Sequence, residues 1–228
     1  MTLTIYESLE QGSPEWLQAR AGIVTASTVG KLLTSTGKVA NNDTSRSLTE
    51  TLVAERITGR ADPMHPTRDM ERGNILEPFA RDLYSEQNKV SVGQIGFARL
   101  DIDNLTIGAS PDGLIGDNGG LEIKCPRAKT HLRTVFQDEV PAQYMPQIQA
   151  CMYVLDRAWW EFVSYVPGLP LYIKRVRRDQ DWITNISLAA EKYEDDATAL
   201  IDAFEVRTAG LPPTEYFDPF AEEAITFG

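Results

Sequence analysis

The chain has 228 residues, 42% of them hydrophobic and 24% charged, which is enough for one folded core and at most two small domains. Two cysteines are too few for a disulfide scaffold, a four-thiolate zinc site or an iron–sulfur cluster supplied by one chain. The formal net charge of −11, taken alone, argues against binding to nucleic acid, which usually accompanies a basic excess.

The acidic residues are concentrated towards the C-terminus. Residues 1–178 contain 20 Lys and Arg against 21 Asp and Glu, whereas residues 179–228 contain 2 against 12. The mean charge therefore describes neither part, and the nearly neutral part can still hold DNA through a few placed cations. No repeat or linker divides the sequence, so we expect a single domain over 1–228 with an acidic helical segment at about 179–228.

The sequence predicts no membrane span and no targeting segment. It contains no run of eighteen apolar residues, and its first residues lack the basic-then-apolar pattern of a signal peptide. We therefore expect a cytoplasmic protein.

Capping signals predict two short helices near the N-terminus. Ser13-Pro14-Glu15 combines a capping hydroxyl, a proline for the first turn and an acid near the positive end of the helix dipole. This helix should end near Gly22. Thr25-Ala26-Ser27 then offers a second N-cap before Val29.

Two longer helices should follow a polar loop. Residues 34–47 are rich in turn-forming residues and predict a loop. Ser47 with Glu50 fits a capping box that opens a helix, and Gly59 fits its end. Apolar residues at helical spacing predict a further helix over 69–88.

The middle of the chain changes to short β-rich segments. They cover 95–100, 105–109, 114–115 and 121–125 and are separated by turn residues, which predicts an antiparallel meander.

Helices and strands then alternate up to the C-terminal region. A helix is expected over 142–155, strands over 159–166 and 171–177, and a long helix from about 181 to 210. The order predicts an α/β fold with a central mixed or antiparallel sheet flanked by helices.

The strongest chemical signal lies around Asp112, Glu122 and Lys124. Glu122 and Lys124 are two residues apart on a predicted strand, so both should point to the same face. If this strand packs against the turn at Asp112, two carboxylates and one ammonium converge. Carboxylates, water and phosphate oxygens are typical ligands of Mg²⁺, and metal-assisted hydrolysis of a phosphodiester needs such a site. A surface ion pair beside an ordinary hairpin is the simpler alternative for an isolated E-x-K.

The flanking residues favour the metal site and carry a family resemblance. The segments Ser-Pro-Asp112-Gly and Leu-Glu122-Ile-Lys124-Cys-Pro, with Gly73-x-x-x-Glu77 before them and Gln147-x-Gln149 after, resemble the lambda-exonuclease-like, YqaJ-type viral recombinase family. This family belongs to the PD-(D/E)xK nucleases, so the resemblance implies a restriction-endonuclease-like core. The matching motifs span roughly residues 14 to 178 in order.

The resemblance assigns roles to the catalytic residues. It implies that Asp112, Glu122 and the main-chain carbonyl of Ile123 ligate Mg²⁺ or Mn²⁺, with two ions at the site, and that Lys124 is the catalytic lysine. Glu77 would contact the second ion or its waters. Gln147 would position the lysine or the scissile phosphate, and Tyr144 lies one helical turn away from it. A surface acid and a polar helix face are the alternatives for Glu77 and Gln147.

The resemblance also implies a pocket for the 5′-phosphate of the DNA substrate. Arg20, Ser27 and Ser110 would form it, since an arginine offers a planar fork to phosphate oxygens and a helix N-terminus adds amide donors. Met70 matches an apolar wedge between terminal base pairs. Simple capping and helix packing are the alternatives for these residues.

By the same resemblance, the chain is a Mg²⁺-dependent exonuclease that degrades one strand of linear duplex DNA from its 5′ end to mononucleotides. It would leave 3′ overhangs, form a homotrimeric ring, and work with a single-strand annealing protein in a bacterial or phage-infected cell. The alternatives are another PD-(D/E)xK enzyme such as a restriction-type endonuclease, and a non-catalytic DNA-binding module on a degenerate nuclease fold.

Overall fold

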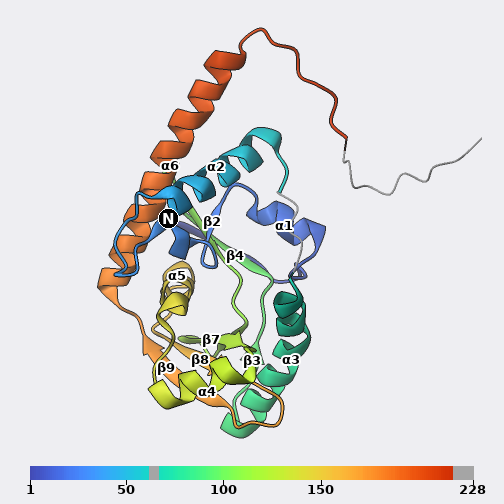
Figure 1. Cartoon of the computed structure of the whole chain (residues 1–228), viewed down its shortest axis with the longest axis vertical. Helices are drawn as coiled ribbons and strands as arrows, with labels where there is room; N and C mark the ends of the chain where they lie inside the picture. Colours follow the sequence, from blue (N-terminus) through green and yellow to red (C-terminus); the bar gives the residue numbers. More distant parts are fainter. Residues whose placement is uncertain (62–66, 218–228) are drawn as a thin grey trace, which may run out of the picture.

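A computed structural model of the chain describes residues 1–61 and 67–217 (Figure 1). Within them the α-helices are α1 Pro14–Arg20, α2 Asp43–Thr58, α3 Arg68–Asn88, α4 Ala128–Gln137, α5 Met145–Val154 and α6 Gln180–Thr208. The strands are β1 Thr2–Tyr6, β2 Val24–Thr25, β3 Val92–Gly93, β4 Phe97–Ile102, β5 Leu105–Ala109, β6 Gly113–Ile115, β7 Gly119–Lys124, β8 Trp159–Ser164 and β9 Tyr172–Arg177.

The predicted α/β class is confirmed, and the strands are divided over two mixed sheets. One sheet has the order β1-β4-β5-β2 and the other has the order β3-β6-β7-β8-β9. The predicted meander is therefore interrupted between β5 and β6, where Pro111 and Asp112 lead the chain from one sheet to the other. β7 pairs antiparallel with β6 and parallel with β8, so the strand that carries Glu122 and Lys124 is central in its sheet.

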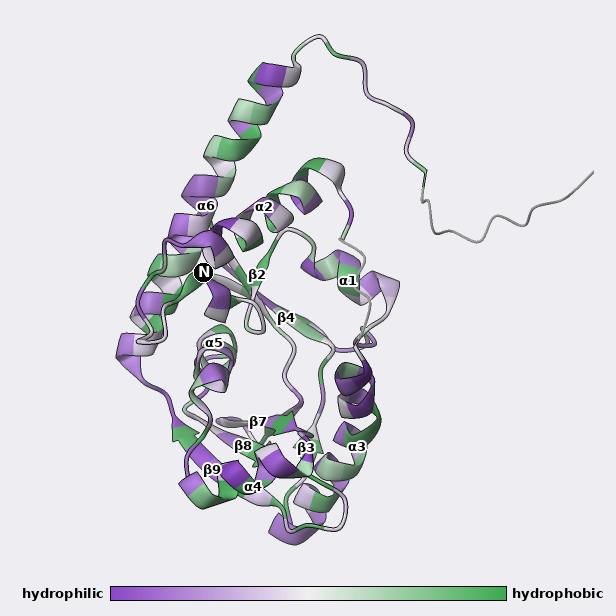
Figure 2. Ribbon diagram, viewed as in Figure 1, coloured by the Kyte–Doolittle hydropathy of each residue, from purple (hydrophilic) through white to green (hydrophobic). Residues whose placement is uncertain are grey.

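Helix α5 lies between the two sheets (Figure 1). Its apolar side chains join those of both sheets and of α2 and α6 in one large core cluster. Figure 2 shows hydrophobic and hydrophilic residues mixed along α6, and its buried residues, such as Ile183, Ile186 and Ala190, recur every three to four positions, as expected for a helix with one buried side. The core thus fixes both sheets against a common helix.

The opposite face of the five-stranded sheet is covered by α3. Leu121 and Ile123 of β7 pack there against Ala80 and Tyr84 of the helix. Because side chains alternate along a strand, Glu122 and Lys124 point to the other face of β7. Both predicted functional residues therefore lie on the α5 side.

Two glycines at the beginning of β7 are required by the packing of β8. A Cβ atom on Gly119 would lie 2.2 Å from the Trp159 ring, and one on Gly120 would lie 2.2 Å from the Trp160 ring. The indoles of β8 occupy the space that these side chains would need.

The N-terminal helices differ in part from the prediction. Ser13 caps α1 as expected, by accepting from the Trp16 amide. The helix predicted from Val29 is a four-residue 3₁₀ helix, Val29–Leu32, whose N-cap Thr28 makes no side-chain cap. The capping box at Ser47 is wrong: the N-cap of α2 lies five residues earlier, at Asn42, which forms a reciprocal box with Ser45. The polar loop therefore ends at Asn42, and Gly59 ends the helix in the left-handed conformation as predicted.

The prediction for 69–88 is confirmed by α3, and the last four predicted elements are confirmed by α5, β8, β9 and α6. Four elements were not predicted, namely β1, β2, β3 and α4. The acidic segment is helical over α6, and its residues 218–228 lie outside the described residues. No helix in the described ranges is both long and apolar enough to cross a membrane.

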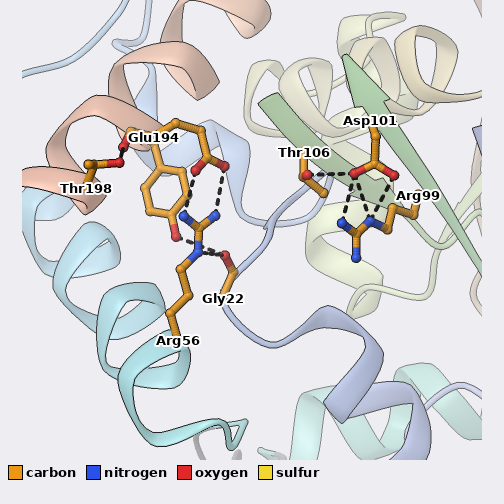
Figure 3. A network of polar contacts seen from close by, with 8 residues as sticks. Gly22, Arg56, Arg99, Asp101, Thr106, Glu194 and Thr198 are labelled. Carbon is orange, nitrogen blue, oxygen red and sulfur yellow. Dashed lines mark hydrogen bonds and ion pairs between the residues drawn. The ribbon is translucent and has the colours of Figure 1, made fainter. Parts of the chain in front are cut away.

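Helices α2 and α6 are joined by an arginine, which we call the Arg56 junction (Figure 3). Arg56 pairs through both terminal nitrogens with Glu194, at 2.6 and 2.8 Å, and its Nε donates to the Gly22 carbonyl at 2.7 Å. The Tyr193 hydroxyl donates to the same carbonyl at 2.9 Å. This junction fixes the segment that follows α1 against the two helices.

Candidate active site

The turn before β6 holds Asp112 directly against β7. Asp112 is buried, and its Oδ2 accepts the Ile123 amide at 2.6 Å. The following residue must be glycine, since a Cβ on Gly113 would lie 2.4 Å from Val92. The predicted approach of the Asp112 turn to the E-x-K strand is therefore present. Burial raises the pKa of Asp112, against the opposing effect of Lys124.

Glu122 and Lys124 meet on the same face of β7, as their spacing predicts. Lys124 Nζ lies 2.5 Å from Glu122 Oε1. Glu122 is fully buried, and neither of its carboxylate oxygens accepts a well-directed hydrogen bond from the described residues. Burial raises the pKa of Glu122 to about 8, and the nearby Asp112 adds to this. Burial lowers the pKa of Lys124, but the carboxylates of Glu122 and Asp112 outweigh it and leave the pKa above its ordinary value.

The helical acid Glu77 reaches the same region from α3. It forms an ion pair with Arg81 one turn further along the helix. Burial, followed by the charge of Asp112, raises the pKa of Glu77 to about 7, against the effects of Arg81 and Lys124. Arg81 also donates its Nε to the Asp112 carbonyl at 2.7 Å. Sequence reasoning missed Arg81, because a bond to a main-chain carbonyl leaves no pattern in the sequence.

Tyr144 and Gln147 differ in their relation to the lysine. The Tyr144 ring lies 5.4 Å from Lys124 Nζ and stacks on Phe162, with 5.5 Å between ring centroids. Gln147 is half-buried on α5, and its side chain makes no hydrogen bond to the described residues. Its neighbour Gln149 is fully buried and bonds to the Arg177 carbonyl and the Asp179 amide, which joins α5 to the start of α6.

Part of this group, namely Glu77, Arg81, Lys124 and Tyr144, lines two adjoining clefts. The first, of about 540 Å³, is lined by Lys124, Tyr144 and Glu77, among others. The second, of about 710 Å³, is lined by Trp16 and Arg81. Glu77 and Met70 line both clefts, so this edge of α3 separates them. Met70 is 41% exposed there.

The residues of the predicted 5′-phosphate pocket form a connected group beside the second cleft. Arg20 donates to Ser27 Oγ at 3.0 Å, and its guanidinium lies 3.7 Å above the centre of the Trp16 ring. Trp16 in turn donates its indole N–H to Ser110 Oγ at 2.9 Å. Trp16, which the sequence did not single out, thus connects the two ends of the group.

Arg20 is electrostatically unusual within this group. Its Nε is buried without an acceptor among the described residues. Burial lowers the pKa of Arg20 to about 10, against the charge of Glu55. An anion at this position would satisfy the free donor and restore the stability of the cation.

One part of the expected phosphate chemistry needs correction. Ser27 precedes the N-cap Thr28 and bonds to Arg20 and Thr25 Oγ1 instead of capping a helix. The helix that follows has four residues of 3₁₀ type. Ser27 therefore contributes its hydroxyl, without the aligned amides of an α-helix.

The donor set suits a hard divalent cation that completes its shell with water and substrate. Asp112, Glu122 and a carbonyl supply oxygen ligands, which Mg²⁺ prefers. Glu122 brings a buried carboxylate oxygen without any donor, and a cation would compensate it. Within residues 1–61 and 67–217, no three His, Cys, Asp or Glu side chains already converge as a ready metal cluster. Two carboxylates with open positions are typical of Mg²⁺ sites that bind phosphate.

Comparisons with known proteins agree with this geometry. Residues 15–158 match the YqaJ-like viral recombinase domain, and this match covers the Arg20 group, all three acids and Lys124. The chain belongs to the YqaJ-like viral recombinase family. No curated protein matches the sequence.

Solved structures support the same family. The alkaline exonuclease of Laribacter hongkongensis is 32% identical, with a TM-score of 0.77, over 88% of this chain and all of that one. The same enzyme in complex with dAMP gives a TM-score of 0.78 at the same identity and coverage. A phage-related exonuclease from Haemophilus somnus, 17% identical over 78% of this chain and 96% of that one, shares the fold with a TM-score of 0.55.

The fold is thus that of the PD-(D/E)xK nucleases, as predicted. Family and structure together identify a DNA exonuclease, and exonucleases of this family act on DNA ends. The naive objection from the net charge of −11 is overturned.

Proposed function

We propose that the chain is a Mg²⁺-dependent 5′-to-3′ exonuclease that degrades one strand of linear duplex DNA to mononucleotides and leaves 3′ overhangs. The observation that carries this proposal is the fully buried Glu122 carboxylate, which receives no well-directed hydrogen bond from the described residues and lies against Lys124 and beside the second acid, Asp112. An isolated surface ion pair would be solvated, and burying two acids beside one lysine is costly unless a further cation binds.

Asp112, Glu122 and the Ile123 carbonyl would hold the first ion, and Glu77 would serve a second. Mn²⁺, which accepts the same oxygen ligands, would also fit. A bound ion would supply Lewis-acid polarisation of the scissile phosphate. Lys124 would orient the attacking water or stabilise the charge that develops on the phosphate. Tyr144 shields one side of the lysine, and we retain Gln147 as a residue that meets the scissile phosphate only when DNA is bound.

The end of the degraded strand would be held by the Arg20 group. Arg20, Ser27 and Ser110 would bind the terminal 5′-phosphate, and the free Nε–H of Arg20 supports this assignment. Met70, exposed where the two clefts meet, would wedge between the terminal base pairs. The dAMP complex of the Laribacter enzyme supports a deoxynucleoside monophosphate as the product released from the first cleft.

The assembly and its setting follow the family resemblance. We propose one nuclease domain over 1–228, a homotrimeric ring around the duplex, and a single-strand annealing protein that coats the new overhang. The acidic segment 179–228 would face solvent or this partner. The reaction would take place in the cytoplasm of a bacterial or phage-infected cell.

A digestion experiment tests the reaction. A linear duplex with a 5′-phosphate, labelled at each end in separate samples, is incubated with Mg²⁺ and with a chelator. We expect mononucleotides from the 5′ end with Mg²⁺ alone. Cleavage of a closed circular duplex would instead indicate an endonuclease, and binding without degradation would indicate a non-catalytic module.

The same substrates test the phosphate pocket. Removing Arg20 takes away a charge-assisted hydrogen bond of roughly 2 kcal/mol, so Arg20→Ala should slow phosphorylated ends by about 30-fold. Ends without phosphate should be affected much less. Arg99→Ala, which removes an exposed arginine paired with Asp101 on β4, is the matched control. Equal losses on both kinds of end would contradict the assignment of the pocket.

A further inference from the structure

The three acids of the site come from three separate segments, and only two of these are fixed by local structure. Asp112 and Glu122 belong to the β6–β7 hairpin and its preceding turn, where the Ile123 amide bonds to Asp112. Glu77 belongs to α3, which meets this sheet through the packing of Ala80 and Tyr84 on Leu121. The helix is also bonded to the sheet region by Arg72, which donates to the Cys125 carbonyl, and by the Tyr84 hydroxyl, which donates to Glu161. None of these contacts includes the Glu77 carboxylate, so they do not by themselves fix where it lies.

One side chain connects the Glu77 carboxylate directly to the Asp112 turn. Arg81 donates its Nε to the Asp112 carbonyl at 2.7 Å and pairs through Nη2 with the Glu77 carboxylate. No other side chain in the described ranges bonds to both of these residues. The planar guanidinium presents these donors in a fixed relation, which a lysine ammonium cannot reproduce.

We propose that Arg81 is a positioning residue of the metal site, which fixes the helical acid Glu77 relative to the Asp112 turn. The inference rests on the proposed metal-dependent nuclease. Arg81 is 11% exposed at its side chain, and its Nε and one terminal nitrogen are already occupied, so little of it remains for a DNA phosphate. Its removal should therefore weaken the binding of divalent cations, and leave the affinity for DNA ends nearly unchanged.

Binding of Mn²⁺ to the protein without DNA tests this proposal. The paramagnetic resonance signal of the free ion measures the binding. Loss of a residue that orients a metal ligand typically costs 10- to 100-fold in affinity. We expect Arg81→Gln to raise the Mn²⁺ dissociation constant by about 10-fold or more. The Mg²⁺ concentration for half-maximal hydrolysis should rise similarly, while KM for DNA ends stays within about twofold. Arg81→Lys keeps the charge and should recover only part of the affinity.

Arg157→Gln is the matched control. Arg157 also braces the β6–β7 hairpin through main-chain carbonyls, those of Gly116 and Gly119, but at the end away from the acids. Its loss should lower the unfolding temperature without changing Mn²⁺ binding. If Arg81→Gln does not fold by circular dichroism, the comparison is made with Arg81→Lys.

The outcomes separate this inference from the proposed function. Wild-type Mn²⁺ affinity in a folded Arg81 variant, or the same loss in the Arg157 variant, overturns the positioning role. A higher KM for DNA with unchanged Mn²⁺ affinity also overturns it, because Arg81 would then bind the substrate. If Mn²⁺ affinity depends on Arg81 as expected but the wild-type chain degrades no DNA, the positioning role is supported and the proposed nuclease activity is contradicted.

Discussion

The Arg56 junction and the active site are built from the same parts but are balanced differently. In each, an arginine pairs with a carboxylate and donates its Nε to a main-chain carbonyl. At the Arg56 junction one cation meets one carboxylate through two well-directed bonds (Figure 3). At the active site Arg81 and Lys124 face three acids, and Glu122 retains an oxygen without a donor.

This difference in charge balance distinguishes the Arg56 junction, which stabilises the fold, from the active site, whose charges favour the binding of a cation. A buried polar group without a partner costs free energy, so the active site weakens the metal-free fold. The Arg56 junction has no such deficit. An excess of buried negative charge is thus a sign of a missing cation, whereas a short ion pair alone is not.

The largest expected effect concerns Lys124, because the contrast with the Arg56 junction requires this lysine to act in DNA degradation. Lys124→Ala removes the cation at the reacting phosphate and should reduce the rate of DNA degradation by about a thousandfold. The rate of mononucleotide release from a labelled duplex measures this, and circular dichroism verifies the fold. Asp112→Ala should behave similarly. Retained degradation by either folded variant would reject the catalytic assignment.

Removing the arginine of the balanced region should affect stability and leave metal binding intact. Arg56→Ala leaves the Glu194 carboxylate partly buried without its partner, which should lower the free energy of unfolding by about 2 kcal/mol. Urea unfolding measures this loss. The stabilisation that Mg²⁺ gives should equal that of the wild type, and a reduced Mg²⁺ effect would mean that the two regions are coupled.

The smallest expected effect is a gain in stability, in contrast to the loss expected for Arg56→Ala. Glu122→Gln removes a buried charge and should raise the free energy of unfolding of the metal-free protein by about 1 kcal/mol at pH 8. The pKa of Glu122 is raised to about 8 in the folded chain, so the folded state favours the protonated acid. Wild-type stability relative to the variant should therefore be highest below pH 4.5 and should fall as the pH rises through 8.

With Mg²⁺ present, the wild type should become more stable than the Glu122→Gln variant. Urea unfolding of both proteins with and without Mg²⁺ measures the change, and we expect the ion to stabilise the wild type more than the variant. A variant less stable than the metal-free wild type at pH 8 would show that the Glu122–Lys124 pair is itself stabilising.

Helices with clear end signals could be predicted from the sequence, and those without could not. Ser13-Pro14 and the periodic 69–88 segment each identified a helix. Helix α4 was missed because Arg127 offers no side-chain cap, and its apolar residues Val135 and Phe136 are exposed while His131 is buried. The Ser47 box was wrong because the helix is capped by Asn42 and Ser45, a pair that the Ser/Thr-x-x-Glu/Gln template does not describe.

The acids of the site could be predicted because a recognisable motif carries them. Glu122 and Lys124 follow from the period of a strand, and their meeting with Asp112 from the motif. Arg81 and Trp16 could not be predicted, since they act through a carbonyl and a serine hydroxyl that are distant in sequence. The division of the strands into two sheets depends on long-range pairing, which local patterns do not encode.

The glycines under the tryptophans of β8 limit how β7 can change. A slip of β7 by one residue would place Leu121 where Trp160 admits no side chain, and it would turn Glu122 and Lys124 to the α3 face. The two glycines thus determine which face of β7 receives Glu122 and Lys124. In a saturation mutagenesis screen for folded protein, Gly119 and Gly120 should tolerate as few substitutions as Lys124 does in a screen for activity.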